Sequence, residues 1–126
     1  MELSKQQRKF TLALGKLIIF INERGYEVKI HELNRTIEQQ RRYIKDGASK
    51  TKDSRHLDNL AADIVIFKDD KVIPDYEYRQ FGERWEFLGG RWGGRFGLED
   101  QPREVQDVKL GWDAGHMEFR KVDIRA

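Results

Sequence analysis

The sequence predicts a small α+β domain in which helices pack on one antiparallel sheet. Three observations lead to this prediction. Apolar residues near the start recur at helical spacing, later segments alternate or are rich in β-branched residues, and short turns separate them. With 126 residues, 38% of them hydrophobic, and neither a repeat nor a linker, the chain is expected to form a single domain over residues 1–126.

Three helices are expected. The first is amphipathic, with Ser4 as its cap and Gly25 as its end. Its apolar stripe consists of Phe10, Leu14, Leu17, Ile18 and Ile21. A second helix is predicted over residues 36–45 and a third over residues 75–88.

Three strands are expected to form the sheet. Residues 26–30 alternate polar and apolar, which predicts a strand with one buried face. Residues 61–67 are apolar and β-branched, as in a central strand, and Asp69-Asp70 supplies a turn into residues 71–73. Residues 116–124 are predicted to close the sheet.

Two segments read as loops. Residues 46–55 contain no large apolar side chain, so this stretch is expected to be exposed. Residues 89–97 are rich in glycine and are also expected to be a loop.

The composition excludes several classes of protein. The 24 Lys and Arg residues are interspersed with 22 Asp and Glu residues, so the net charge of +2 gives no indication of nucleic-acid binding. The absence of cysteine excludes disulfides and thiolate metal sites. No apolar run approaches the roughly 20 residues of a membrane span. Lys16 interrupts the best signal-peptide candidate, so neither membrane insertion nor a secretory signal is expected.

Two short segments contain the candidate metal-binding and catalytic residues. His56 and Asp63 lie around the start of one predicted strand, and Asp113 and His116 at the start of another. Two imidazoles and one carboxylate are a ligand set for catalytic zinc, which keeps a fourth position open. His56 and Asp63 are seven residues apart, so a loop or bulge near Asn59 must bring both to one metal. A tight turn over residues 113–116 would place the Asp113 carboxylate where a general base belongs.

Each of these residues has a structural alternative. A single histidine is more often a surface or hydrogen-bonded core residue, and an aspartate at a strand start often caps a turn. His31, the third histidine, lies in a polar stretch and is interpreted as structural.

The motifs together resemble a known family. Ser54-x-His56-x6-Asp63, followed about fifty residues later by Asp113-x-x-His116, is similar to the zinc peptidases that include D-alanyl-D-alanine carboxypeptidases and dipeptidases and phage L-alanyl-D-glutamate endopeptidases. Residues 34–40, which include Arg35-Thr36, resemble that family's Arg-Thr/Ser element, and residues 46–51 resemble the loop before its first zinc histidine. Residues 90–97 and 112–116 resemble the compact phage endolysins in particular.

The resemblance implies a role for each matching position. One zinc ion would be bound by His56, Asp63 and His116, at a cleft beside the sheet. Asp113 would be the general base, and Arg35 would bind the substrate near the scissile amide. Gln40 and Ser54 match positions that line the cleft. Asn59 departs from the glycine found in many members, which affects the turn between the ligands.

The resemblance also implies a function. The expected activity is hydrolysis of an amide in the stem peptide of bacterial peptidoglycan, at the L-alanyl-D-glutamate bond. The alternatives are a D-alanyl-D-alanine carboxypeptidase or dipeptidase with the same zinc chemistry, and a non-catalytic, zinc-stabilised module that binds the cell wall. As an endolysin the protein is expected to accumulate in the host cytoplasm and to reach the wall through a separate pore. Nothing in the sequence suggests more than a monomer, so a monomer is expected.

Overall fold

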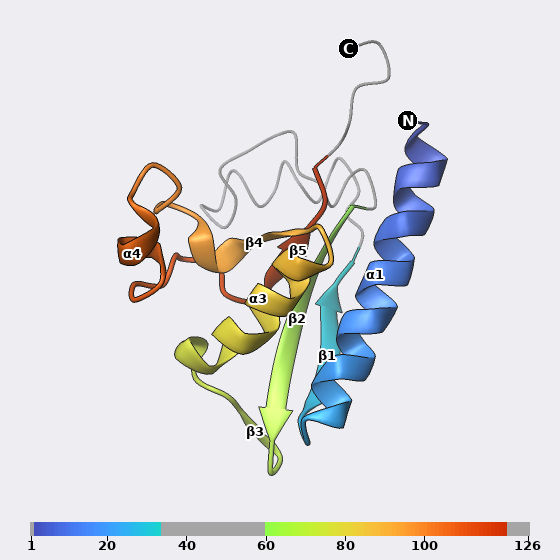
Figure 1. The fold of residues 1–126 in the computed structure, drawn as a ribbon. Helices are drawn as coiled ribbons and strands as arrows, with labels where there is room; N and C mark the ends of the chain where they lie inside the picture. Colours follow the sequence, from blue (N-terminus) through green and yellow to red (C-terminus); the bar gives the residue numbers. More distant parts are fainter. Residues whose placement is uncertain (1, 34–59, 121–126) are drawn as a thin grey trace, which may run out of the picture.

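The computed structural model describes residues 2–33 and 60–120. In this part of the chain, helices cover one face of a five-stranded sheet, which confirms the predicted α+β class (Figure 1). The predicted helix over residues 36–45 and the predicted loop over residues 46–55 lie outside the described residues.

The first helix, α1, spans Leu3–Glu23. Its predicted apolar stripe lies against the core, where Phe10, Leu14, Leu17 and Ile21 are buried and Ile18 is partly buried. The predicted cap is wrong, because Ser4 lies inside the helix and Glu2 is the N-cap residue, without a side-chain cap bond. Gly25 ends the helix as predicted, with a left-handed φ of 87°.

The sheet contains β1 (Glu27–Glu32), β2 (Ala61–Lys68), β3 (Lys71–Val72), β4 (Arg91–Trp92) and β5 (His116–Glu118). Its order is β1-β2-β5-β4, β3 also pairs with β2, and these pairings are antiparallel. The predicted turn between β2 and β3 is confirmed. Asp69 and Asp70 have φ values of 54° and 62°, as a two-residue hairpin turn with positive φ at both positions requires.

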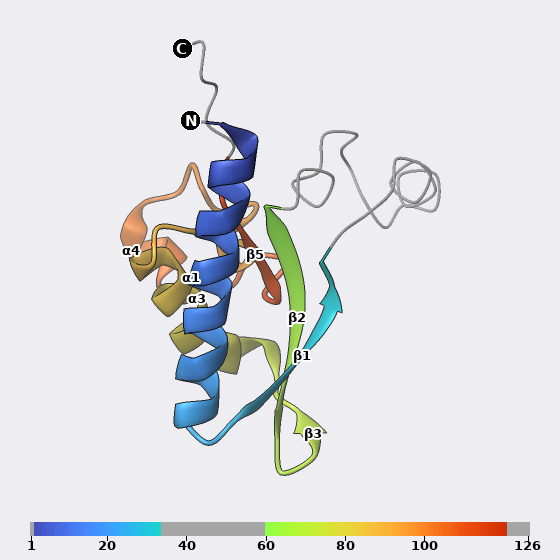
Figure 2. The same ribbon diagram turned by 90° about the vertical axis from the view of Figure 1, so that its right-hand side faces the viewer.

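The predicted third helix is present in two parts. A 3-10 turn, η1 (Asp75–Tyr78), leads directly into α3 (Arg79–Phe87). Figure 2 shows α1 and α3 on the same side of β2. A second 3-10 turn, η2 (Gly93–Arg95), and a short helix, α4 (Arg103–Gln106), follow β4.

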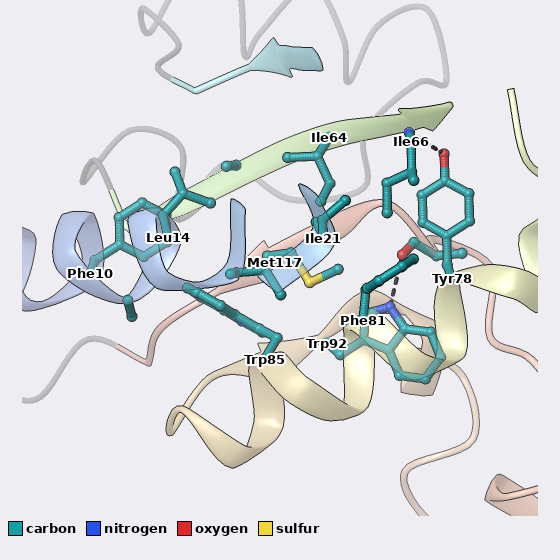
Figure 3. Close-up of a cluster of buried hydrophobic side chains, with 14 of the residues drawn as sticks. Phe10, Leu14, Ile21, Ile64, Ile66, Tyr78, Phe81, Trp85, Trp92 and Met117 are labelled. Atoms are coloured by element: carbon teal, nitrogen blue, oxygen red, sulfur yellow. Dashed lines mark hydrogen bonds between the residues drawn. The ribbon is translucent and has the colours of Figure 1, made fainter. Parts of the chain in front are cut away.

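The hydrophobic core lies between the sheet and the helices α1 and α3 (Figure 3). Its largest fully buried side chains are Trp85, Trp92, Phe10 and Phe81. The polar Nε1 atoms of both buried indoles form hydrogen bonds. Trp85 Nε1 donates to the Glu118 carbonyl at 3.0 Å, and Trp92 Nε1 donates to the Ala114 carbonyl at 2.7 Å. These bonds attach the core to the segment around β5.

Two boundaries differ from the predictions. The closing strand ends at Glu118, so the described residues 119 and 120 are not part of it. The glycine-rich segment is not only a loop, because Arg91 and Trp92 form the edge strand β4. Among residues 2–33 and 60–120, no helix combines the length and apolar character that a membrane crossing requires.

Candidate metal centre

The two-residue period of the strands separates the core from the candidate site. In β2, Ile64 and Ile66 point into the core, so Asp63 lies on the opposite face of the sheet. His116 in β5 is the direct cross-strand partner of Asp63, which places both side chains on that same face. The antiparallel register therefore brings together two residues that are 53 positions apart.

Three predicted site residues converge there. His116 Nδ1 lies 3.0 Å from Asp63 Oδ1 and 3.8 Å from Asp113 Oδ2. The candidate ligand atoms of Asp63, Asp113 and His116 all lie within 4.8 Å of one another. One imidazole and two carboxylates at this spacing suit a single divalent metal ion such as zinc.

A tight turn positions Asp113, as the sequence predicted. The His116 amide donates to the Asp113 carbonyl at 3.1 Å, which closes a four-residue turn before β5. Gly93 lies directly beneath this turn. A Cβ atom at Gly93 would lie 2.0 Å from the Asp113 carbonyl oxygen and 2.8 Å from His116 Cβ. The glycine-rich segment is thus needed for close packing against the turn.

Glu118 holds the other side of the His116 ring. Its Oε1 lies 2.8 Å from His116 Nε2, and both side chains are about 10% exposed. Arg91 in β4 is the cross-strand partner of Glu118, with Nη1 3.5 Å from Glu118 Oε2, and it also pairs with Glu99. A carboxylate on the second nitrogen of a metal-binding histidine fixes the ring orientation and leaves Nδ1 available for the metal.

Glu118 and Arg91 were not predicted as site residues from the sequence. A signal for Glu118 exists in the sequence, because His116 and Glu118 are two apart on a predicted strand and must share a face. Arg91 had no such signal, since its place depends on the short strand β4.

The carboxylates change the protonation of His116. Burial lowers the pKa of its imidazole, but hydrogen bonds to Asp63 and Glu118 and the charge of Asp113 outweigh burial and raise the pKa from 6.5 to about 9. The site thus attracts positive charge strongly, and a metal cation must displace this proton to bind Nδ1.

The remaining predicted site residues lie outside the described residues. They are Arg35, Gln40, Ser54 and His56, and the same holds for Asn59. His31 is exposed in β1, at an irregularity of the pairing between Ile30 and Glu32, next to the position where Glu32 pairs with Asp63.

A cavity of about 620 Å³ lies apart from the three converging residues. It is bordered by α1 and by the segment that follows α3, including Lys9, Arg91, Arg95 and Phe119. Arg95 is buried and forms ion pairs with Glu86 and Asp107, so its charge stabilises the fold. None of the three converging residues lines this cavity.

Comparisons with known proteins agree with this geometry. The chain is 38% identical over 96 residues to the L-alanyl-D-glutamate peptidase of Listeria phage A118. It is also similar in structure to the L-Ala D-Glu endopeptidase ChiX of Serratia marcescens, with a TM-score of 0.63 and 22% identity over 93% of this chain and 85% of that one. The chain has the ChiX fold. The resemblance seen in the sequence is thereby confirmed.

A second solved structure is similar. It is the vancomycin resistance D,D-pentapeptidase VanY of a VanB-type cassette, in complex with Zn(II), with a TM-score of 0.56 and 18% identity over 87% of this chain and 70% of that one. No family model matches the chain. The alignment with the phage peptidase covers 71% of this chain, but the chain spans only about a third (34%) of that protein's length.

Proposed function

We propose that this protein is a zinc-dependent peptidase that hydrolyses the L-alanyl-D-glutamate bond in the stem peptide of bacterial peptidoglycan. The observation that carries the proposal is the convergence of Asp63, Asp113 and His116 on one face of the sheet. The similarity to a phage L-alanyl-D-glutamate peptidase and the ChiX fold support the same bond. Residues 1–126 would form a single peptidase domain that acts as a monomer.

In this proposal, Asp63 and His116 hold the zinc ion together with His56. When bound, zinc supplies a Lewis acid and lowers the pKa of a water ligand to about 7. Glu118 accepts a hydrogen bond from Nε2–H of His116, which leaves the Nδ1 lone pair directed toward the zinc position beside Asp63 and Asp113.

Asp113 would be the general base. Its Oδ2 lies on the Nδ1 side of His116, on a turn that its own backbone carbonyl closes. There it accepts a proton from the attacking water and later returns this proton to the leaving amine. Arg35 would bind the substrate and stabilise the negative charge that develops on the scissile carbonyl oxygen. Gln40 and Ser54 would line the substrate cleft.

The biological role proposed is that of an endolysin, supported by the phage origin of the peptidase that this chain resembles. The protein would then be made in the host cytoplasm and act on the wall after release through a separate pore. Neither a nucleic-acid partner nor membrane insertion is part of this role.

The proposal is tested by digesting purified cell walls with the zinc-loaded protein. The expected result is release of fragments with a new D-glutamate amino terminus and a new L-alanine carboxyl terminus, seen by mass spectrometry and amine labelling. Loss of only the terminal D-alanine would instead identify a carboxypeptidase, the alternative that the similarity to VanY favours. Zinc-loaded protein that binds walls but releases no fragment would identify a binding module.

A further inference from the structure

Trp112 is an exposed indole immediately before the proposed base. Its side chain is 65% exposed, whereas the other two tryptophans of the chain, Trp85 and Trp92, are fully buried in the core. Indole has the largest hydrophobic surface of any side chain, and burying this surface would be strongly favourable. A ligand that covers Trp112 would gain part of this burial energy.

The Phe96 ring contacts both the Trp112 indole and the His116 imidazole. The Trp112 ring lies 5.4 Å from the Phe96 ring, and Phe96 in turn lies 5.4 Å from the His116 imidazole. The Arg91 guanidinium lies over the Phe96 ring at 4.7 Å and fixes it from another direction. Phe96 thus links Trp112 to the same histidine that Asp63 and Asp113 approach.

The backbone around Trp112 is also fixed. The Gly111 amide donates to the Gly94 carbonyl at 2.6 Å, and the Asp113 amide donates to the Gly93 carbonyl at 3.3 Å. These bonds hold the residues on both sides of Trp112 against the glycine-rich segment. Gly97 lies beside the ring, since a Cβ atom there would lie 3.3 Å from Trp112 Cδ1, and its φ of +85° suits glycine.

A large rigid aromatic ring next to a reaction centre binds ligands at low entropic cost, because few rotatable bonds must be ordered. We infer that Trp112 forms a wall of the substrate site and binds an apolar C–H face beside the scissile bond. This inference rests on the proposed function. In peptidoglycan such a face is offered by the alanine methyl group of the stem peptide and by the muramic sugar to which that alanine is attached, and the test below distinguishes these two sources.

Trp112 can report on its own occupancy. Because Trp85 and Trp92 are fully buried, Trp112 should dominate quenching of the protein's fluorescence by acrylamide. Zinc-loaded Asp113→Asn protein, which should not turn over, is titrated with N-acetylmuramoyl-L-alanyl-D-isoglutamine and with free L-alanyl-D-isoglutamine. Protection by both ligands would show that the peptide covers the indole, and protection by the muramoyl compound alone would assign the sugar. Absence of protection by either would contradict the inference.

Kinetics give a second, independent readout. Trp112→Ala should raise KM for soluble muropeptides about tenfold, equivalent to about 1.4 kcal/mol, with kcat and zinc content nearly unchanged. Trp112→Phe should restore much of the loss. Phe87→Ala is the matched control, because Phe87 is 75% exposed at the end of α3, where it contacts Arg84.

The outcomes separate this inference from the proposed function. A wild-type protein that cleaves muropeptides, with the same KM in Trp112→Ala and Phe87→Ala, would refute the role of Trp112 and leave the proposed function intact. A wild-type protein that cleaves nothing would refute the proposed function. The quenching titration would then still decide whether Trp112 binds the wall fragment.

Discussion

Replacement of Glu118 by glutamine tests how the metal centre is held. Glu118 does not belong to the group of three converging residues, but its Oε1 lies 2.8 Å from Nε2 of His116. The glutamine side chain would have nearly the same shape, and its amide oxygen could still accept a hydrogen bond from Nε2. The substitution therefore keeps the shape of the side chain but removes the negative charge behind the ring, and with it the ion pair between Glu118 and Arg91.

The expected loss follows from the burial of this pair. Both side chains are about 10% exposed, so water screens their interaction poorly. Loss of a carboxylate partner behind a metal-binding histidine costs about 10- to 100-fold in metal affinity. Because glutamine retains the hydrogen bond, we expect about a tenfold loss in zinc affinity, equivalent to about 1.4 kcal/mol.

The assay is zinc competition against a chromogenic chelator at fixed pH. Glu99→Gln is the matched control, since Glu99 also pairs with Arg91 but has an exposed side chain and no contact with His116 in the described part of the chain. The control should bind zinc as the wild type does. Equal affinities for Glu118→Gln and wild type, with both folded, would refute the argument that Glu118 orients the imidazole.

Three further outcomes follow from the geometry. Gly93→Ala should destabilise the protein and weaken zinc binding, because its Cβ would collide with the Asp113 carbonyl in the turn that leads to His116. Gly15→Ala is the control, since its Cβ in α1 would meet nothing within 4 Å. Thermal melts should show a loss of stability for Gly93→Ala and a gain of about 0.5–1 kcal/mol for Gly15→Ala. In chelator-treated protein the raised pKa of His116 contributes about 3 kcal/mol of stability below pH 6.5. This contribution should disappear as the pH rises through about 9. Urea midpoints that stay constant over this pH range would contradict the prediction. Asp63→Ala should lose zinc in equilibrium dialysis while the helical circular dichroism is retained, since Asp63 faces away from the core; full zinc occupancy would exclude Asp63 as a ligand.

The elements with strong periodicity were predictable from the sequence. The stripe of α1 and the apolar run of β2 each bury a continuous surface, so the hydrophobic pattern alone identifies them. The short strand β4 was not predictable. It has two residues, and its pairing with β5 places Trp92 next to Met117 in the core. Such a strand depends on tertiary contacts and has no period of its own.

Only the part of the candidate site that depends on local sequence could be predicted from the residues. Asp113 and His116 are close in sequence, so a local turn was enough to join them, and the structure confirms this turn. The approach of Asp63 to His116 depends on the register between β2 and β5, which only the folded chain shows. The roles of His56, Arg35, Gln40 and Ser54 stay predictions.

The central claim is that Asp63 and His116, together with His56, hold a metal ion for a reaction in which Asp113 moves the proton. It is tested most directly by measuring zinc content and wall hydrolysis together in Asp113→Ala and His116→Ala proteins. We expect Asp113→Ala to retain one zinc ion and lose turnover, and His116→Ala to lose both. Near-normal hydrolysis by zinc-loaded Asp113→Ala protein would contradict the account.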